Sequence, residues 1–123
     1  MANFSNMFEI PSLKYGYSNA RVKGMKGLLF KRDFLDELIK VGSVDSMIEL
    51  LQRTHYKEEL VALSVRYSGS ELVELAVGAN VRNVVRKIRK ITPKSDLPIM
   101  DALLKRWDLL NLKMIVTARR AGY

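Results

Sequence analysis

A stripe of branched apolar residues at helical spacing limits what this chain can fold into more than any other feature. The stripe consists of Val73, Val77, Val81, Val84, Val85, Ile88 and Ile91. A recurrence near 3.6 residues, sustained over several turns, is typical of one amphipathic helix. No sustained apolar and polar alternation occurs elsewhere to indicate a strand. The sequence therefore predicts an all-α fold with a long helix over residues 71–91.

The opposite side of this helix is basic. It carries Arg82, Arg86, Arg89 and Lys90. Such a face is often simply solvated, and it is also suited to acidic protein, lipid or nucleic-acid surfaces. Nucleic-acid modules usually add zinc ligands, stacking aromatics or a recognition helix, and none of these signatures accompanies the basic run. A small basic nucleic-acid-binding module is therefore kept as an alternative interpretation of this face. Solvent and acidic protein or lipid surfaces are favoured over nucleic acid.

Further helices are predicted on both sides of the long one. They run over residues 18–31, 33–41, 43–54, 57–67 and 98–121. Gly42 is expected to end one of them, Ser43 to begin the next, and Ser70 to cap the long helix. In and just before the first of these helices, Gly16, Ala20 and Gly24 recur every four residues, which on a helix predicts a bare strip where a neighbour packs closely.

The last helix is apolar on two sides. Its expected core stripe is Met100, Leu103, Leu104, Trp107, Leu110, Met114 and Ala118, with Asn111 as a buried residue inside it. A second patch, formed by Leu109, Leu112 and Val116, lies on the other side. A helix that is apolar on two sides must be covered on two sides. We therefore expect the isolated chain to associate with itself or with another chain.

Composition excludes several kinds of chemistry. The 123 residues are a usual length for one domain, and the net charge is +8. There is no cysteine and only one histidine, His55, so disulfides, thiolate metal sites and histidine pairs are impossible. Gly24 and Gly27 lie too close together for a phosphate-binding loop, and leucines stand where its lysine and hydroxyl belong. We expect no catalytic, cofactor-binding or metal-binding residues.

Separated motifs carry a family resemblance. "YSNARVKGMKGLLFKRDFLDELI" begins with Tyr17, Asn19, Ala20 and Arg21. "MIELLQRTHYKEEL" follows an L-L-x-x-T-x-Y pattern through Leu50, Leu51, Thr54 and Tyr56. "RWDLLNLKMIVTARRAGY" contains a D-x-x-N-L-K pattern through Asp108, Asn111, Leu112 and Lys113. In order and spacing, residues 15–123 resemble the C subunit of archaeal-type (A-type) ATP synthases, called the d subunit in the vacuolar proton pump.

The resemblance implies a non-catalytic, all-helical subunit on the cytoplasmic face of the membrane. Members of this family are funnels of three similar helical units, which join a central axle to the proteolipid ring during ion-driven ATP synthesis or ATP-driven ion pumping. Because family chains are much longer, residues 1–123 resemble a single domain, the first of the three units. The chain is then a fragment, an engineered piece or a short form.

The expected partners are the axle subunits and the ring, with self-association of the isolated fragment. The contact residues we predict are Arg82, Arg86, Arg89, Lys90, Leu109, Leu112 and Val116.

Overall fold

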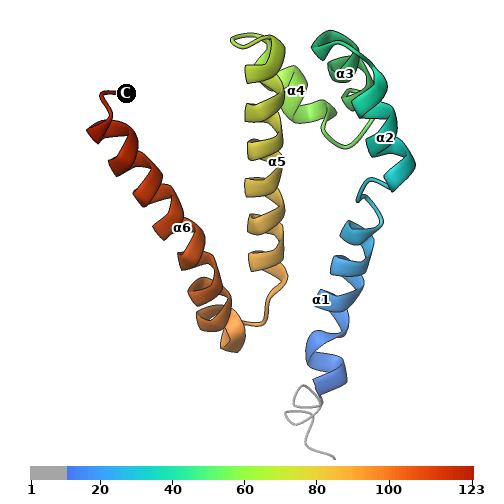
Figure 1. Ribbon diagram of the computed structural model, residues 1–123. Helices are drawn as coiled ribbons and strands as arrows, with labels where there is room; N and C mark the ends of the chain where they lie inside the picture. Colours follow the sequence, from blue (N-terminus) through green and yellow to red (C-terminus); the bar gives the residue numbers. More distant parts are fainter. Residues whose placement is uncertain (1–10) are drawn as a thin grey trace, which may run out of the picture. The chain divides into compact units, whose positions relative to one another are not determined.

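Every regular element that the structure describes is helical. The computed structural model describes residues 11–123. Its elements are α1 (Pro11–Lys26), α2 (Arg32–Lys40), α3 (Val44–Leu51), α4 (Lys57–Ser64), α5 (Gly69–Ile91), the 3-10 turn η2 (Lys94–Asp96) and α6 (Leu97–Arg120) (Figure 1). The predicted all-α fold is confirmed. Among these helices, none is both long enough and apolar enough to cross a bilayer.

The described chain divides into two compact units. Residues 19–88 form one, which we call the central unit. Residues 11–18 and 89–123 belong to the other, which we call the terminal unit. The long helices α1 and α5 contribute to both. Each unit therefore has its own contacts and its own exposed surfaces.

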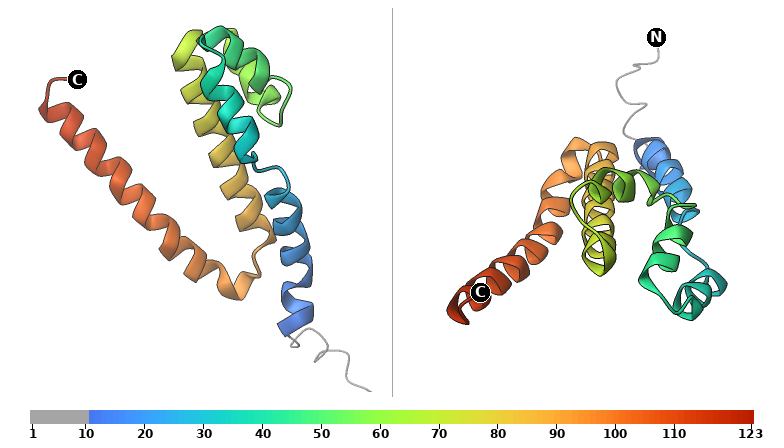
Figure 2. Two further views of the ribbon diagram at one scale, coloured as in Figure 1. Left: turned by 45° about the vertical axis from the view of Figure 1, so that its right-hand side comes forward. Right: turned by 90° about the horizontal axis from the view of Figure 1, so that it is seen from above.

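Leucines from α3, α4 and α5 form the core of the central unit. Leu51, Leu60 and Leu72 are buried together with Ala76. The residues packed around them are Phe30, Leu38, Met47, Ile48, Tyr56, Leu63, Tyr67 and Val73. α3 and α4 accordingly lie beside the first half of α5 (Figure 2). Leu60 retains only 1% exposure, so it is the deepest side chain of this core.

The fully buried residues of α5 do not belong to the valine stripe. Leu72 and Ala76 are buried, whereas Val81 remains 54% exposed. At 100° per residue, Leu72 and Ala76 lie on a face turned well away from the valines, and α3 and α4 pack against that face. Val73 packs against the core from the edge of this face, so the valine stripe is covered only in part.

Local signals account for the end of α2 and the start of α3. Gly42 has φ +69° and ends α2, since a left-handed residue after a helix is best supplied by glycine. Ser43 caps α3 as predicted, and its Oγ accepts a hydrogen bond from the Ser46 backbone N–H at 3.1 Å. The prediction for Ser70 is wrong, because Gly69, at φ +59°, already begins α5 and Ser70 lies in its first turn.

Two packing expectations are not met in the described chain. A Cβ built on Gly16 or Gly24 would meet no atom within 4 Å, so no neighbour packs against the predicted strip. The core stripe of α6 is also wrong: this helix has no buried residue, and Trp107 is 65% exposed. Asn111 is exposed as well. The physical reason is that the described part of the terminal unit contains no second long helix to cover α6.

Candidate docking surfaces

The predicted basic contact residues lie along α5. Arg82 and Arg86 are exposed in the central unit, and Arg89 and Lys90 are exposed in the terminal unit. Arg89 is already engaged: its Nε donates to Asp101 Oδ1 at 2.8 Å and its Nη2 to Oδ2 at 3.0 Å. This hydrogen-bonded pair lowers the pKa of Asp101. Arg82, Arg86 and Lys90 are therefore better placed than Arg89 to meet a partner.

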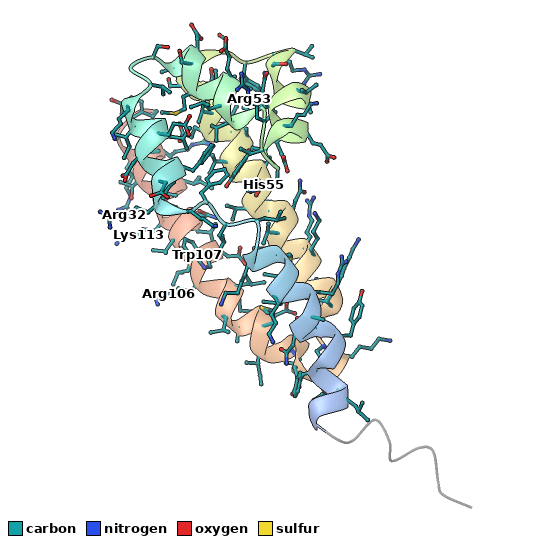
Figure 3. All side chains as sticks on the ribbon, turned by 90° about the vertical axis from the view of Figure 1, so that its right-hand side faces the viewer. Arg32, Arg53, His55, Arg106, Trp107 and Lys113 are labelled. Atoms are coloured by element: carbon teal, nitrogen blue, oxygen red, sulfur yellow. The ribbon has the colours of Figure 1, made fainter. Side chains whose placement is uncertain are left out.

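The predicted apolar contact residues are exposed on α6. Leu109, Leu112 and Val116 all face solvent, and Leu112 is 58% exposed. Arg106, Trp107 and Lys113 also project from this helix (Figure 3). Arg82 and Arg86 belong to the central unit, and the apolar contact residues belong to the terminal unit.

Two polar contacts hold the start of the terminal unit together. Lys14 Nζ donates to Asp96 Oδ1 at 3.0 Å, and the Ser18 hydroxyl donates to the backbone oxygen of Ile91. Hydrogen bonds from Tyr15 and Lys14 lower the pKa of Asp96. These contacts fasten the beginning of α1 to the turn that precedes α6, and they leave the rest of α6 without support from that segment.

A groove in the central unit was not anticipated from the sequence. It has a volume of about 670 Å³ and is bounded by the second half of α1, the segment 54–59 and the second half of α5. Its floor is apolar and includes Val22, Met25, Leu29, Val81, Val84 and Ile88. We call it the valine groove. Val81, Val84, Val85 and Ile88, in the second half of α5, thus line this groove, whereas Val73 packs against the core.

Glu59 lies at the wall of the valine groove, where α4 meets α5. Its Oε1 accepts hydrogen bonds from Asn80 Nδ2 at 3.1 Å and from Asn83 Nδ2 at 3.2 Å. Its Oε2 is buried without a hydrogen-bond partner in the described part of the chain. Asn80 and Asn83 continue the Leu72 and Ala76 face of α5 at helical spacing, which is the sequence signal that would have pointed to this contact.

The pKa of Glu59 is lowered from its ordinary value. Burial by itself raises the pKa of this carboxyl group, because it disfavours the charged form. Hydrogen bonds from its own backbone N–H, from Asn83 and from Asn80 outweigh burial, and the charge of His55 acts in the same direction. Glu59 is therefore ionised at neutral pH and held by neutral amide donors.

The L-L-x-x-T-x-Y motif builds the segment beside this glutamate. Leu51 is in the core, and the Thr54 hydroxyl donates to the Leu51 backbone oxygen at 2.6 Å and accepts from the Tyr56 N–H at 3.2 Å. His55 and Tyr56 stack with ring centroids 4.4 Å apart, and both lie close to Phe30. His55 therefore has a packing role between α3 and α4 (Figure 3).

The described residues offer little for metal binding or acid–base chemistry. Within residues 11–123, no three acidic or histidine side chains gather as metal ligands would. The carboxylates with lowered pKa, Glu59, Asp96 and Asp101, are each explained by the hydrogen-bond donors beside them. The surfaces that remain are suited to docking: two helix faces and one groove.

Comparison with known proteins defines the class of protein that carries these surfaces. The model of the ATP synthase (C/AC39) subunit family matches residues 18–123, and the chain belongs to this family. The resemblance drawn from the separated motifs is thereby confirmed. No solved structure matches the chain significantly.

Among its relatives are the C subunits of A-type ATP synthases from three archaea. The protein of Methanosarcina mazei is 30% identical over 108 residues, which cover 88% of this chain and 30% of the relative. That of Thermococcus kodakarensis is 31% identical over 108 residues, covering 88% and 29%. That of Methanocaldococcus jannaschii is 28% identical over 108 residues, covering 88% and 27%. The chain thus spans less than a third of the length of these relatives.

Proposed function

We propose that this chain is a non-catalytic part of the central stalk of a rotary A/V-type ATP synthase. In this role it lies peripherally at the cytoplasmic face of the membrane and joins the central axle to the proteolipid ring. It thereby transmits torque during ion-driven ATP synthesis or ATP-driven ion pumping. The observation that carries the proposal is the continuous family match over residues 18–123.

The surfaces of the structure support a docking role. α6 has no buried residue, and its apolar side chains are exposed. A contiguous exposed apolar face commonly marks an interaction site. The basic residues of α5 and the net charge of +8 favour an acidic partner surface. We propose that Arg82, Arg86 and Lys90 provide charged contacts and that Leu109, Leu112 and Val116 provide apolar ones. Arg89 contributes by holding Asp101.

A charge-reversal experiment tests the basic contacts. The variant changes Arg82, Arg86 and Lys90 to glutamate and leaves the Arg89 and Asp101 pair intact. We expect at least about tenfold weaker binding to purified axle subunits or ring of an A-type ATP synthase, since several close charge pairs are reversed at once. Pull-down at physiological salt provides the measurement.

A matched control separates this site from overall charge. The control variant changes Lys40, Arg66 and Lys94 to glutamate, three exposed basic residues outside the predicted contacts. It has the same net charge as the test variant and is expected to bind nearly as the unchanged chain does. Equal losses in the two variants would overturn the assignment of these contacts. Binding to duplex DNA that weakens steeply with salt, without binding to axle or ring, would instead favour the nucleic-acid alternative.

A further inference from the structure

The valine groove lies open in the central unit and has no place in the contacts proposed above. Leu29 and Val81 both line it, and Leu29 is 69% exposed. Apolar residues brought together in a groove and left in contact with water are stabilised when another apolar surface covers them. The chemistry of the rim indicates what that surface is.

The rim of the groove is predominantly basic. Lys26 at the end of α1, Lys57 at the start of α4 and Lys87 on α5 border it, and all three are exposed. Glu58 is the exposed acidic residue among the lining side chains. Exposed lysines around an apolar floor attract a partner with an apolar centre and acidic margins.

Glu59 does not cancel this charge at the surface. Its Oε1 is occupied by the amides of Asn80 and Asn83, and its Oε2 is buried. The negative charge is therefore turned into the protein, against neutral donors, while the ammonium groups of the lysines remain in solvent. An approaching partner meets the lysines first.

We propose that the valine groove binds an acidic amphipathic helix of a partner protein, with apolar side chains on the valine floor and carboxylates paired to Lys26, Lys57 and Lys87. Val81, Val84, Val85 and Ile88 form ridges at helical spacing over about 10 Å of α5. Ridges of this kind accept the i, i+3, i+4 and i+7 side chains of a third helix packed between two others.

A second copy of this chain is a poor occupant. The exposed helix available for docking, α6, is itself basic next to its apolar residues, through Lys105, Lys113, Arg119 and Arg120. Placing these cations beside the groove lysines brings like charges together, which disfavours the contact. These charges favour an acidic helix of another protein over a second copy of this chain as the occupant. This inference does not depend on a role in an ATP synthase.

Synthetic helices provide a direct test with the full chain. The probe is a fluorescent amphipathic peptide of about 18 residues, or five turns, with leucines at i, i+3, i+4 and i+7 and glutamates beside them. A second peptide carries lysines in place of the glutamates. We expect the glutamate peptide to bind at least about tenfold more tightly in fluorescence anisotropy, because three charge pairs change sign.

Variants of the chain locate the binding. The groove variant changes Lys26, Lys57 and Lys87 to glutamate, and the variant with Lys40, Arg66 and Lys94 changed to glutamate is its control. The groove variant is expected to lose at least about tenfold in affinity for the glutamate peptide and to gain affinity for the lysine peptide. This exchange of preference also shows that the groove variant is folded. The control is expected to bind the glutamate peptide more tightly than the lysine peptide, as the unchanged chain does.

Three results would each overturn the proposal. The peptides could bind equally well, the two variants could lose affinity equally, or the preference could fail to reverse in the groove variant. A fourth result, loss of binding to phosphatidylglycerol vesicles in the groove variant with unchanged peptide binding, would assign the groove to lipid. None of these outcomes involves axle or ring, so failure here is distinct from failure of the proposed coupling role.

Discussion

At the scale of single residues, Glu59 lines the valine groove and also joins α4 to α5. An ionised carboxylate with one buried, unpartnered oxygen is costly unless donors stabilise it. Asn80 and Asn83 supply these donors from α5, so they join the start of α4 to the middle of the long helix. The contact places the side chains of Lys57 and Glu58, which neighbour Glu59 in the sequence, at the rim of the groove.

The lowered pKa of Glu59 predicts a specific dependence of stability on pH. Because the pKa is lower in the folded state, ionised Glu59 contributes stability that is fully present above its unfolded pKa, about 4.3. The contribution is lost as the pH falls through the lower, folded pKa. Urea unfolding at a series of pH values, from about 6 down to about 3, should therefore show a smaller decline for Glu59→Gln than for the unchanged chain.

A carboxylate elsewhere serves as the control for this measurement. Asp36 is exposed on α2, and Asp36→Asn is expected to leave the decline unchanged. Identical pH profiles for Glu59→Gln and the unchanged chain would contradict the assigned role of Asn80 and Asn83.

Some of these residues were predictable from the sequence, and others were not. Ser43 and Gly42 were predictable, because capping and left-handed backbone are local requirements that particular residue types satisfy. The pairing of Glu59 with Asn83 was not predictable, because it joins residues 24 positions apart in the sequence. Their spacing along α5 was visible, but which face of α5 is buried depends on where α3 and α4 pack.

At the scale of elements, glycines have opposite roles in neighbouring helices. Gly42 ends α2 with a positive φ, a conformation that a side chain makes unfavourable. Gly16 lies inside α1, in ordinary helical backbone with empty space around it. The first glycine is required by the backbone, and the second lowers the intrinsic stability of its helix.

Alanine substitutions at these two positions should therefore change stability in opposite directions. Gly42→Ala is expected to lower the free energy of unfolding by about 1–2 kcal/mol, the cost of a left-handed residue with a Cβ. Gly16→Ala is expected to raise helix stability by up to about 1 kcal/mol. Thermal unfolding followed by circular dichroism measures both. Destabilisation by Gly16→Ala would show that a neighbour does pack against the bare strip.

The existence of the helices followed from periodicity, whereas their burial did not. The predicted limits of the first helix, 18–31, are wrong, because α1 runs over Pro11–Lys26. The long helix over 71–91 and the last helix over 98–121 were found within a few residues. The stripe of α6 satisfies every pattern of a core helix and is nevertheless exposed. Periodicity identifies a face that is suited to burial, and only the surrounding elements decide whether that face is covered.

At the scale of the whole molecule, the exposed large apolar side chains of residues 11–123 outnumber the buried core residues. Within residues 11–123, four residues make up the buried core, while large apolar side chains are exposed along all of α6. Such a surface is typical of a chain that works in contact with others. Membership of the ATP synthase (C/AC39) subunit family agrees with the exposed apolar side chains.

The exposed faces of α6 also predict self-association at high concentration. Covering Leu109, Leu112 and Val116 removes apolar area from water, and screening of the +8 charge by salt assists the contact. Sedimentation equilibrium should show dimers that increase with protein and salt concentration. Leu112→Glu is expected to shift the equilibrium toward monomer, whereas Ala102→Glu, earlier on the same helix, is expected to have less effect. A strict monomer at millimolar concentration would contradict the prediction.

Binding to a rotor tests the central claim most directly. The rotor assembly of an A-type ATP synthase, ring and axle stripped of their own C/AC39 subunit, is immobilised and exposed to the full chain at about 0.15 M salt. The full-length C/AC39 subunit of that synthase serves as the positive control. The coupling role predicts saturable binding for which this full-length protein competes. Absence of binding under conditions where the full-length protein binds would contradict it.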